Sequence, residues 1–164
     1  MNSAKGLGRL RGSIEKSMSK LGLRPSEQVW QWLDKNLVIP QIVGSPCPGL
    51  IDTGRTPVMR GMLDLYWLPR VHHFTYCKSA RVGGTLFSIA AAIHKIEVWP
   101  GPILWVDPTR KSGSRLSRQE IQPYIEACDP VYHKAFRDRE RFTTLEMMFK
   151  DCVLGIVGTG SATD

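Results

Sequence analysis

Apolar residues recur every three or four positions in two early segments, which predicts two amphipathic helices. The first begins at residues 25–27, where Pro-Ser-Glu is typical of a helix start, and continues toward Leu37. The second begins at residues 56–57 and ends before Pro69, because proline breaks a helix. Between them, residues 40–57 contain four prolines and three glycines, so we expect an ordered loop.

The middle of the chain alternates between strand-like and helix-like patterns. Residues 71–77 include Phe, Thr and Tyr, which predicts a strand. Residues 78–85 form a small, polar, glycine-containing turn, and residues 86–96 are apolar on nearly every side, which predicts a buried helix. The apolar run at residues 103–106 is typical of a parallel strand covered by helices on both faces. Strand, glycine turn, helix and strand together predict a βαβ unit and an α/β fold.

The last third of the chain continues this mixed pattern. Residues 110–118 are polar and basic, so we expect a loop or a helix lead-in, and residues 115–127 predict an amphipathic helix. A charge-dense stretch at residues 132–142 is expected to be exposed. Residues 144–149 and 152–157 predict two strands joined by a tight turn.

Charge separates an N-terminal arm from the rest of the chain. The net charge is +7, but residues 1–24 carry six basic groups and one acidic group, which is +5. Residues 25–164 carry 16 basic and 14 acidic groups, which is only +2. Bulk charge is therefore a weak argument for nucleic-acid binding by the folded body. The arm fits a helix that docks on a partner, and a disordered tail fits it equally well, since three glycines weaken the helix.

Several function classes are excluded or weakened. No apolar run reaches the ~20 residues needed to cross a bilayer, which excludes a transmembrane protein. The four cysteines lie far apart, which excludes a zinc ribbon or a dense disulfide scaffold and fits a reducing compartment. His72 and His73 would point to opposite faces of a strand, so we expect surface or structural roles rather than a shared metal. Cys77 is expected to be buried, and the five tryptophans are expected in the core.

The turn at residues 78–85 (KSARVGGT) is where chemistry is expected. A glycine turn between a strand and a helix directs backbone N–H groups at an anion, and the helix dipole adds to the attraction. Compared with the pattern GxxxxGK[ST], Gly84 stands in the lysine position and Lys78 stands at the front of the loop. Lys78 is long enough to reach phosphates, Arg81 would add a second charge, and Thr85 keeps the hydroxyl that binds Mg²⁺. The alternative is an ordinary turn with a solvated lysine.

Six segments resemble, in order, the large terminase subunit of tailed phages, of the GpA (lambda-like) type. They are VWQWLDKNLVIP (29–40), GRTPVMRGMLD (54–64), KSARVGGT (78–85), GPILWVDPT (101–109), LSRQEIQPYI (116–125) and GIVGTGSA (155–162). In that family the loop reads K-S-A-[RQ]-V-G-x-[ST], with the lysine in front. The resemblance covers roughly residues 25–164.

The resemblance implies an ATP-driven motor that packages phage DNA, with an N-terminal ATPase and a C-terminal metal-dependent endonuclease. It implies a P-loop NTPase-type three-layer αβα fold with a mostly parallel sheet, incomplete at the C-terminus. By this resemblance Lys78 would contact the β/γ phosphates of ATP, Arg81 would sense the γ-phosphate, and Thr85 would bind Mg²⁺. The backbone amides that wrap the phosphates would come from Ser79, Ala80, Arg81, Val82, Gly83 and Gly84. Arg55 and Thr56 fall in the adenine-contacting region.

The resemblance also implies partners and a location. The partners are the small terminase subunit, double-stranded DNA, the portal of the procapsid and further copies in a ring, in the cytoplasm of the bacterial host, without a membrane. The arm at residues 1–24 would bind the small subunit. A basic cluster would track the DNA backbone, with a solvated face as the alternative; it consists of Arg110, Lys111, Arg115 and Arg118.

In the family, the Walker B carboxylates and the catalytic glutamate follow the glycine turn that matches residues 158–162. The resemblance therefore predicts that residues 25–164 are the N-terminal part of the ATPase domain, without these carboxylates and without the nuclease domain. We expect this chain alone to hydrolyse ATP negligibly, because no base would orient the attacking water. Two alternatives remain: a non-catalytic fragment that is only a protein- or DNA-binding module, and an unrelated P-loop enzyme such as a nucleotide kinase.

Overall fold

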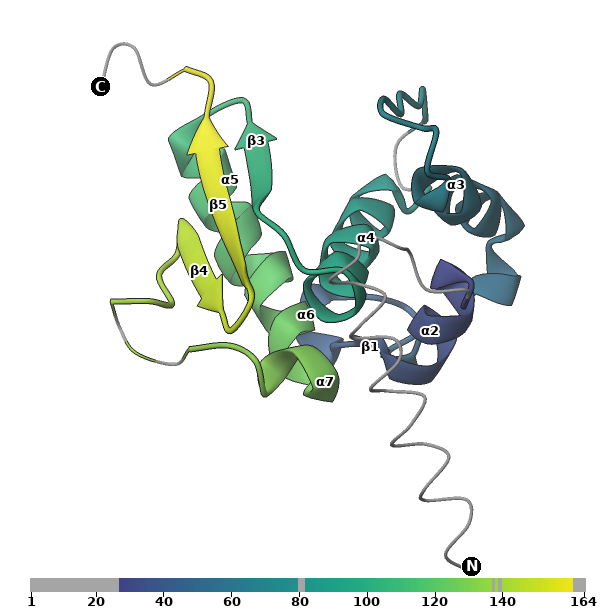
Figure 1. The fold of residues 1–164 in the computed structure, drawn as a ribbon, viewed down its shortest axis with the longest axis horizontal. Helices are drawn as coiled ribbons and strands as arrows, with labels where there is room; N and C mark the ends of the chain where they lie inside the picture. Colours follow the sequence, from purple (N-terminus) through teal and green to yellow (C-terminus); the bar gives the residue numbers. More distant parts are fainter. Residues whose placement is uncertain (1–26, 80–81, 137, 139, 161–164) are drawn as a thin grey trace, which may run out of the picture.

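The computed structural model describes residues 27–79, 82–136, 138 and 140–160. The helices around α4 lie beside a small sheet that is backed by helices α5 and α6 (Figure 1). The fold is therefore α/β, as the sequence predicts. The arm at residues 1–24, together with Ala80 and Arg81 of the glycine turn, lies outside the described residues.

Both early amphipathic helices are confirmed. They are α2 (Val29–Asn36) and α3 (Pro57–Trp67), and proline stands at the first position of α3, where its missing N–H is not needed. The segment between them is mostly loop. It also contains two 3₁₀ turns, η1 (Gln41–Val43) and η2 (Thr53–Arg55), and a two-residue antiparallel pairing of β1 (Val38–Ile39) with β2 (Gly49–Leu50).

The buried helix is also confirmed as α4 (Gly84–Val98). Buried side chains occur all around it, including those of Phe87, Ile89, Ile93 and Ile96. It packs against α2 and α3 on one side and α7 (Asp129–Tyr132) on another. The uniform apolar pattern in the sequence thus corresponds to a helix that neighbouring elements surround.

The sheet has three strands in the order β3-β5-β4. Strand β3 (Ile103–Asp107) runs parallel to β5 (Cys152–Gly158), and β4 (Glu146–Phe149) pairs with β5 as the antiparallel hairpin that the sequence predicts. A three-layer αβα arrangement with a mostly parallel sheet is not seen in the described residues, because the sheet combines one parallel pair with one antiparallel pair.

The predicted strand at residues 71–77 is wrong. Among the described residues, 71–79 have no regular secondary structure, so the predicted βαβ unit lacks its first strand. The aromatic side chains of this segment pack on α4 instead: Phe74 and Tyr76 each place their ring centroids 5.6 Å from that of Phe87. Strand propensity depends on finding a sheet neighbour, and here the helix surface buries the same side chains.

The prediction that helices cover both faces of the strand at residues 103–106 is also wrong. Leu104 is 67% exposed and Val106 is 53% exposed. Their neighbours Ile103 and Trp105 are partly buried and pack on the core, so the strand alternates between a covered and an open face. On β5, Val153 and Val157 are exposed as well.

The helix predicted at residues 115–127 is confirmed, but it begins earlier. It consists of α5 (Arg110–Leu116), a π-helical turn η3 (Ser117–Ile121) and α6 (Gln122–Ala127). The early start has a local cause, because Thr109 and Ser112 form a capping box at the N-terminus of α5. None of the helices in the described part of the chain is long and apolar enough to cross a membrane.

Candidate functional site

The N-terminus of α4 is left open by the chain itself. Its N-cap residue, Gly83, has φ 79°, a left-handed conformation that glycine adopts without strain. Among the described residues, no side chain caps this end, and the first backbone bond runs from Phe87 N–H to the Gly83 carbonyl over 2.8 Å. The N–H groups of the first turn and the positive end of the helix dipole therefore face outward, which is the geometry that attracts an anion.

Lys78 lies directly against this helix end. A Cβ atom added to Gly84 would overlap Cδ and Cε of Lys78 and would lie 3.1 Å from the ring of Tyr76. Gly84 is buried, whereas Lys78 as a residue is exposed. The lysine stem thus crosses the first turn of α4, and the two ends of the turn at residues 78–85 meet.

Tyr76 holds the segment before Lys78 in place. Its hydroxyl donates to the carbonyl oxygen of Gly84 over 3.0 Å and lies 3.4 Å from Ser88 Oγ. Ser88 Oγ donates to the same carbonyl over 3.2 Å. Together with the ring contacts to Phe87, these bonds fix the approach to the turn without a strand ladder.

The remaining residues of the predicted loop are placed as follows. Ser79, Val82 and Thr85 are exposed around the helix start, whereas Ala80 and Arg81 lie outside the described residues. Thr85 is in the first turn of α4, where its hydroxyl would be one protein ligand for a phosphate-bound Mg²⁺. In the described part of the chain, no group of three or more His, Cys, Asp or Glu side chains forms a metal site.

Arg55 and Thr56 belong to a different set of contacts. Arg55 Nε lies 3.3 Å from Asp52 Oδ2, and Thr56 stands at the N-cap of α3. Both residues are exposed. Their predicted role at the adenine base stays a prediction that rests on the family resemblance.

A polar network that the sequence analysis missed supports the loop before α3. Thr53 is fully buried; its N–H and its hydroxyl donate to the carboxylate of Asp34 over 2.8 and 3.0 Å. Arg60 donates to the Thr53 hydroxyl over 2.8 Å and to Asp34 over 3.2 Å, and its guanidinium lies over the Trp30 ring at 4.3 Å. The opposite charges of Asp34 and Arg60 on two predicted helices were the available signal. The network joins α2 to α3.

The junction from strand β3 to helix α5 is bonded by its own side chains. The Thr109 hydroxyl accepts from Ser112 N–H over 3.1 Å, and the Ser112 hydroxyl donates to the Asp107 carboxylate. The end of β5 lies against the same place, because Thr159 N–H donates to Asp107 O over 3.0 Å. The capping box thus satisfies two N–H groups of this helix end, those of Thr109 and Ser112, with side chains of the same turn.

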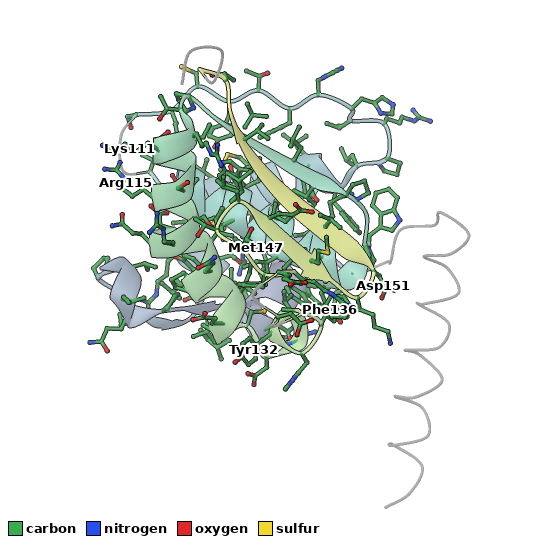
Figure 2. The ribbon with its side chains drawn as sticks, turned by 90° about the vertical axis from the view of Figure 1, so that its left-hand side faces the viewer. Lys111, Arg115, Tyr132, Phe136, Met147 and Asp151 are labelled. Carbon is green, nitrogen blue, oxygen red and sulfur yellow. The ribbon has the colours of Figure 1, made fainter. Side chains whose placement is uncertain are left out.

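The basic cluster lies on the outer surface of the helix that follows. Arg110, Lys111, Arg115 and Arg118 are all exposed. Lys111 and Arg115, one helical turn apart, project from the same side of α5 (Figure 2). Two of the four predicted cations thus share one side of α5, and Arg118 follows in the π-helical turn η3.

The adjacent histidines, Cys77 and the tryptophans had predicted exposures that the structure can be compared with. His72 and His73 are exposed, in line with surface roles, whereas Cys77 is exposed rather than buried. The error at Cys77 follows from the missing strand. Trp32 is buried, and Trp30, Trp67 and Trp105 pack against the core, as predicted; Trp99 is half-buried and meets Trp67 edge to face.

Burial also shifts the pKa of side chains in the core. It lowers the pKa of His94 to about 3 and raises the pKa of the Cys128 thiol to about 11. It also raises the pKa of the Cys152 thiol. These groups stay neutral in the core and do not point to chemistry.

Comparison with known proteins gives one match. Residues 45–164 match the model of the phage terminase large subunit gpA, ATPase domain. Neither the curated proteins nor the solved structures include a match. The matched segment contains the Lys78–Gly84 contact, the open N-terminus of α4 and the basic surface of α5. Because it spans well over half of the sequence, the chain belongs to the family of phage terminase large subunit gpA ATPase domains.

Proposed function

We propose that this chain binds ATP at the N-terminus of α4 and is the nucleotide-binding part of a phage DNA-packaging motor. The observation that carries the proposal is the contact of the Lys78 stem with Gly84, at a helix end whose N-cap residue, Gly83, has no side chain to cap it. A cation and free amides then face one point, which suits a triphosphate. In the full-length protein, this site would drive DNA translocation, accompanied by endonuclease activity.

Each residue of the turn has a role in this proposal. Backbone N–H groups from Ser79 to Gly84 surround the phosphates, and Lys78 neutralises the β and γ groups. Thr85 holds Mg²⁺, which when bound would shield the phosphate charge. Arg81 would sense the γ-phosphate; that role comes from the family resemblance.

The basic surface of α5 supports a second role in the same motor. Arg110, Lys111, Arg115 and Arg118 would contact the phosphate backbone of double-stranded DNA. The small terminase subunit, the portal and further copies of the chain in a ring are the other proposed partners. A chain that binds DNA or a protein partner without binding ATP would instead be a non-catalytic binding module.

The first experiment compares ATP–Mg²⁺ affinity of the wild-type chain and of Lys78→Ala by isothermal titration calorimetry. Removing a charged hydrogen-bond donor costs about 1.5–3 kcal/mol, which is about 10- to 100-fold in affinity. Lys150→Ala is the matched control, because Lys150 is exposed in the turn between β4 and β5. Equal affinity of wild type and Lys78→Ala, or no binding by the wild type, would contradict the proposal.

The second experiment tests the position of Lys78 rather than its presence. In Gly84→Ala, the added methyl group overlaps the far end of the Lys78 side chain, which can swing away. We expect stability to change little, because the up to about 1 kcal/mol by which alanine favours a helix is offset by the 3.1 Å contact of the new methyl group with the Tyr76 ring, and we expect several-fold weaker ATP binding. Unaltered ATP affinity would show that the observed lysine position is irrelevant to the phosphates.

A further inference from the structure

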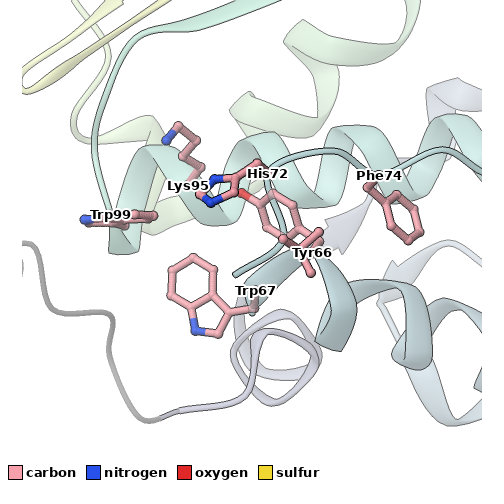
Figure 3. A pocket seen from close by; sticks show the side chains of 7 residues that line it. Tyr66, Trp67, His72, Phe74, Lys95 and Trp99 are labelled. Atoms are coloured by element: carbon pink, nitrogen blue, oxygen red, sulfur yellow. The ribbon is translucent and has the colours of Figure 1, made fainter. Parts of the chain in front are cut away.

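A second candidate site lies at the opposite end of α4. A cavity of about 250 Å³ opens between the end of α3, the irregular segment after it and the end of α4 (Figure 3). Its walls are the rings of Tyr66, Trp67, Phe74 and Trp99, together with the side chains of Val71, His72 and Lys95. Lys95 follows Gly84 by eleven residues, which is about 16 Å along a helix, so the cavity is separate from the proposed phosphate site.

The aromatic walls of the cavity are held by packing. Trp67 and Trp99 meet edge to face, with ring centroids 5.8 Å apart. Trp67 also packs edge to face on the buried His94, at 4.7 Å. Preformed aromatic walls of this kind favour a further ring, because edge-to-face contacts add to the burial of apolar area.

The charge that the described residues bring to the cavity is positive. Lys95 Nζ lies 5.1 Å from the ring centroid of Trp99, and the ion pairs found among the described residues do not include Lys95. Among the described residues that line the cavity, none carries a carboxylate. Arg70 and His73, next to the lining segment, are exposed. An incoming group therefore meets cations around an aromatic hollow, which favours an acidic ligand.

We propose that this cavity docks an acidic peptide segment of a partner protein through one aromatic side chain. The volume lies below the roughly 300–1,000 Å³ of typical small-molecule sites and suits a single ring. Aromatic anchors that fill a pocket dominate many protein interfaces. Carboxylates beside the anchor would pair with Lys95 and receive hydrogen bonds from His72. The proposal does not depend on ATP binding at α4.

The test uses the 164-residue chain and a labelled pentapeptide with a central tryptophan between two aspartates on each side. Fluorescence anisotropy measures its affinity for the wild type, for Lys95→Glu and for Lys150→Glu as a matched surface control. We expect Lys95→Glu to weaken binding about tenfold and Lys150→Glu to leave it unchanged, with a central alanine in the peptide abolishing binding.

Four outcomes would overturn the proposal. These are no binding of the tryptophan peptide to the wild type, equal binding of the alanine peptide, and equal losses in Lys95→Glu and Lys150→Glu. Displacement of the peptide by free indole acetate at the same concentration as by unlabelled peptide is the fourth. It would identify a small aromatic acid as the occupant.

Discussion

Helices α4 and α5 both begin after a turn of small or polar residues, but their N-termini are capped differently. At α5, Thr109, Ser112 and Asp107 bond to one another and to the first-turn amide of Ser112. At α4, Gly83 provides no side chain and the nearby cation belongs to Lys78. A helix end that its own side chains cap offers fewer amides to a ligand, whereas an end that begins at glycine beside a cation is suited to bind one.

The two junctions also differ in how tightly they are packed. A Cβ atom on Gly158 would overlap the backbone of Thr109 and Arg110, so β5 and the start of α5 touch main chain to main chain. The neighbours of Gly84 are instead side chains, namely the flexible end of Lys78 and the edge of the Tyr76 ring. The α5 junction should therefore respond to substitution with a loss of stability, and the α4 junction with a loss of affinity.

The largest effect is expected from Gly158→Ala. Backbone atoms cannot move aside as a side chain can, so we expect a loss of about 3 kcal/mol in the free energy of unfolding. Urea denaturation followed by circular dichroism measures it. Gly155→Ala on the same strand is the control, because its nearest neighbour is Leu104 Cδ1 at an ordinary 3.8 Å. Similar losses in both variants would show that the close approach at Gly158 is not what matters.

The next largest effect is a loss of stability at acidic pH, caused by the buried His94 of α4. Burial between Trp32 and Trp67 lowers the pKa of His94 from 6.5 to about 3, so the unfolded chain takes up a proton that the folded chain refuses. Stability from this residue is complete above pH 6.5 and falls as the pH drops toward 3, by about 1.4 kcal/mol per pH unit.

At pH 5 this amounts to a loss of about 2 kcal/mol relative to neutral pH. Denaturation of wild type and His94→Gln at both pH values measures the difference, with the exposed His73→Gln as control. A His94 signal that titrates near pH 6.5 in an NMR experiment on the folded wild-type chain would refute the prediction.

The smallest effect is expected from Thr109→Ala. Loss of the cap of α5 costs about 1 kcal/mol of stability. ATP affinity should not change, because the proposed phosphate site is at the other junction. Thr56→Ala is the stability control, since Thr56 occupies the N-cap of α3 without a side-chain capping bond. A drop in ATP affinity in Thr109→Ala would show that both helix ends take part in nucleotide binding.

The regular elements were predictable where the local pattern and the tertiary neighbours agree. The helix at residues 57–67 has proline at its start, and residues 86–96 are apolar all round, so both segments could be predicted as helices from the sequence. The prediction of a strand at residues 71–77 was wrong because the rings of Phe74 and Tyr76 pack on Phe87 of α4 instead of on a neighbouring strand. The same failure turned Cys77 from a buried into an exposed residue.

For the candidate site, the sequence by itself determined the residue types, namely a lysine in front of a glycine pair at the start of an apolar helix. This pattern, with its ordered neighbouring motifs, was sufficient to indicate the family. Only the tertiary structure decided that Lys78 lies on Gly84 and that the Tyr76 hydroxyl bonds to the Gly84 carbonyl. It also decided that Trp67, Trp99 and Lys95 line a cavity at the other end of α4. The physical reason is that the residues of one turn and one helix follow from neighbouring positions in the sequence. Contacts between distant segments depend instead on which surface of the fold buries a given side chain.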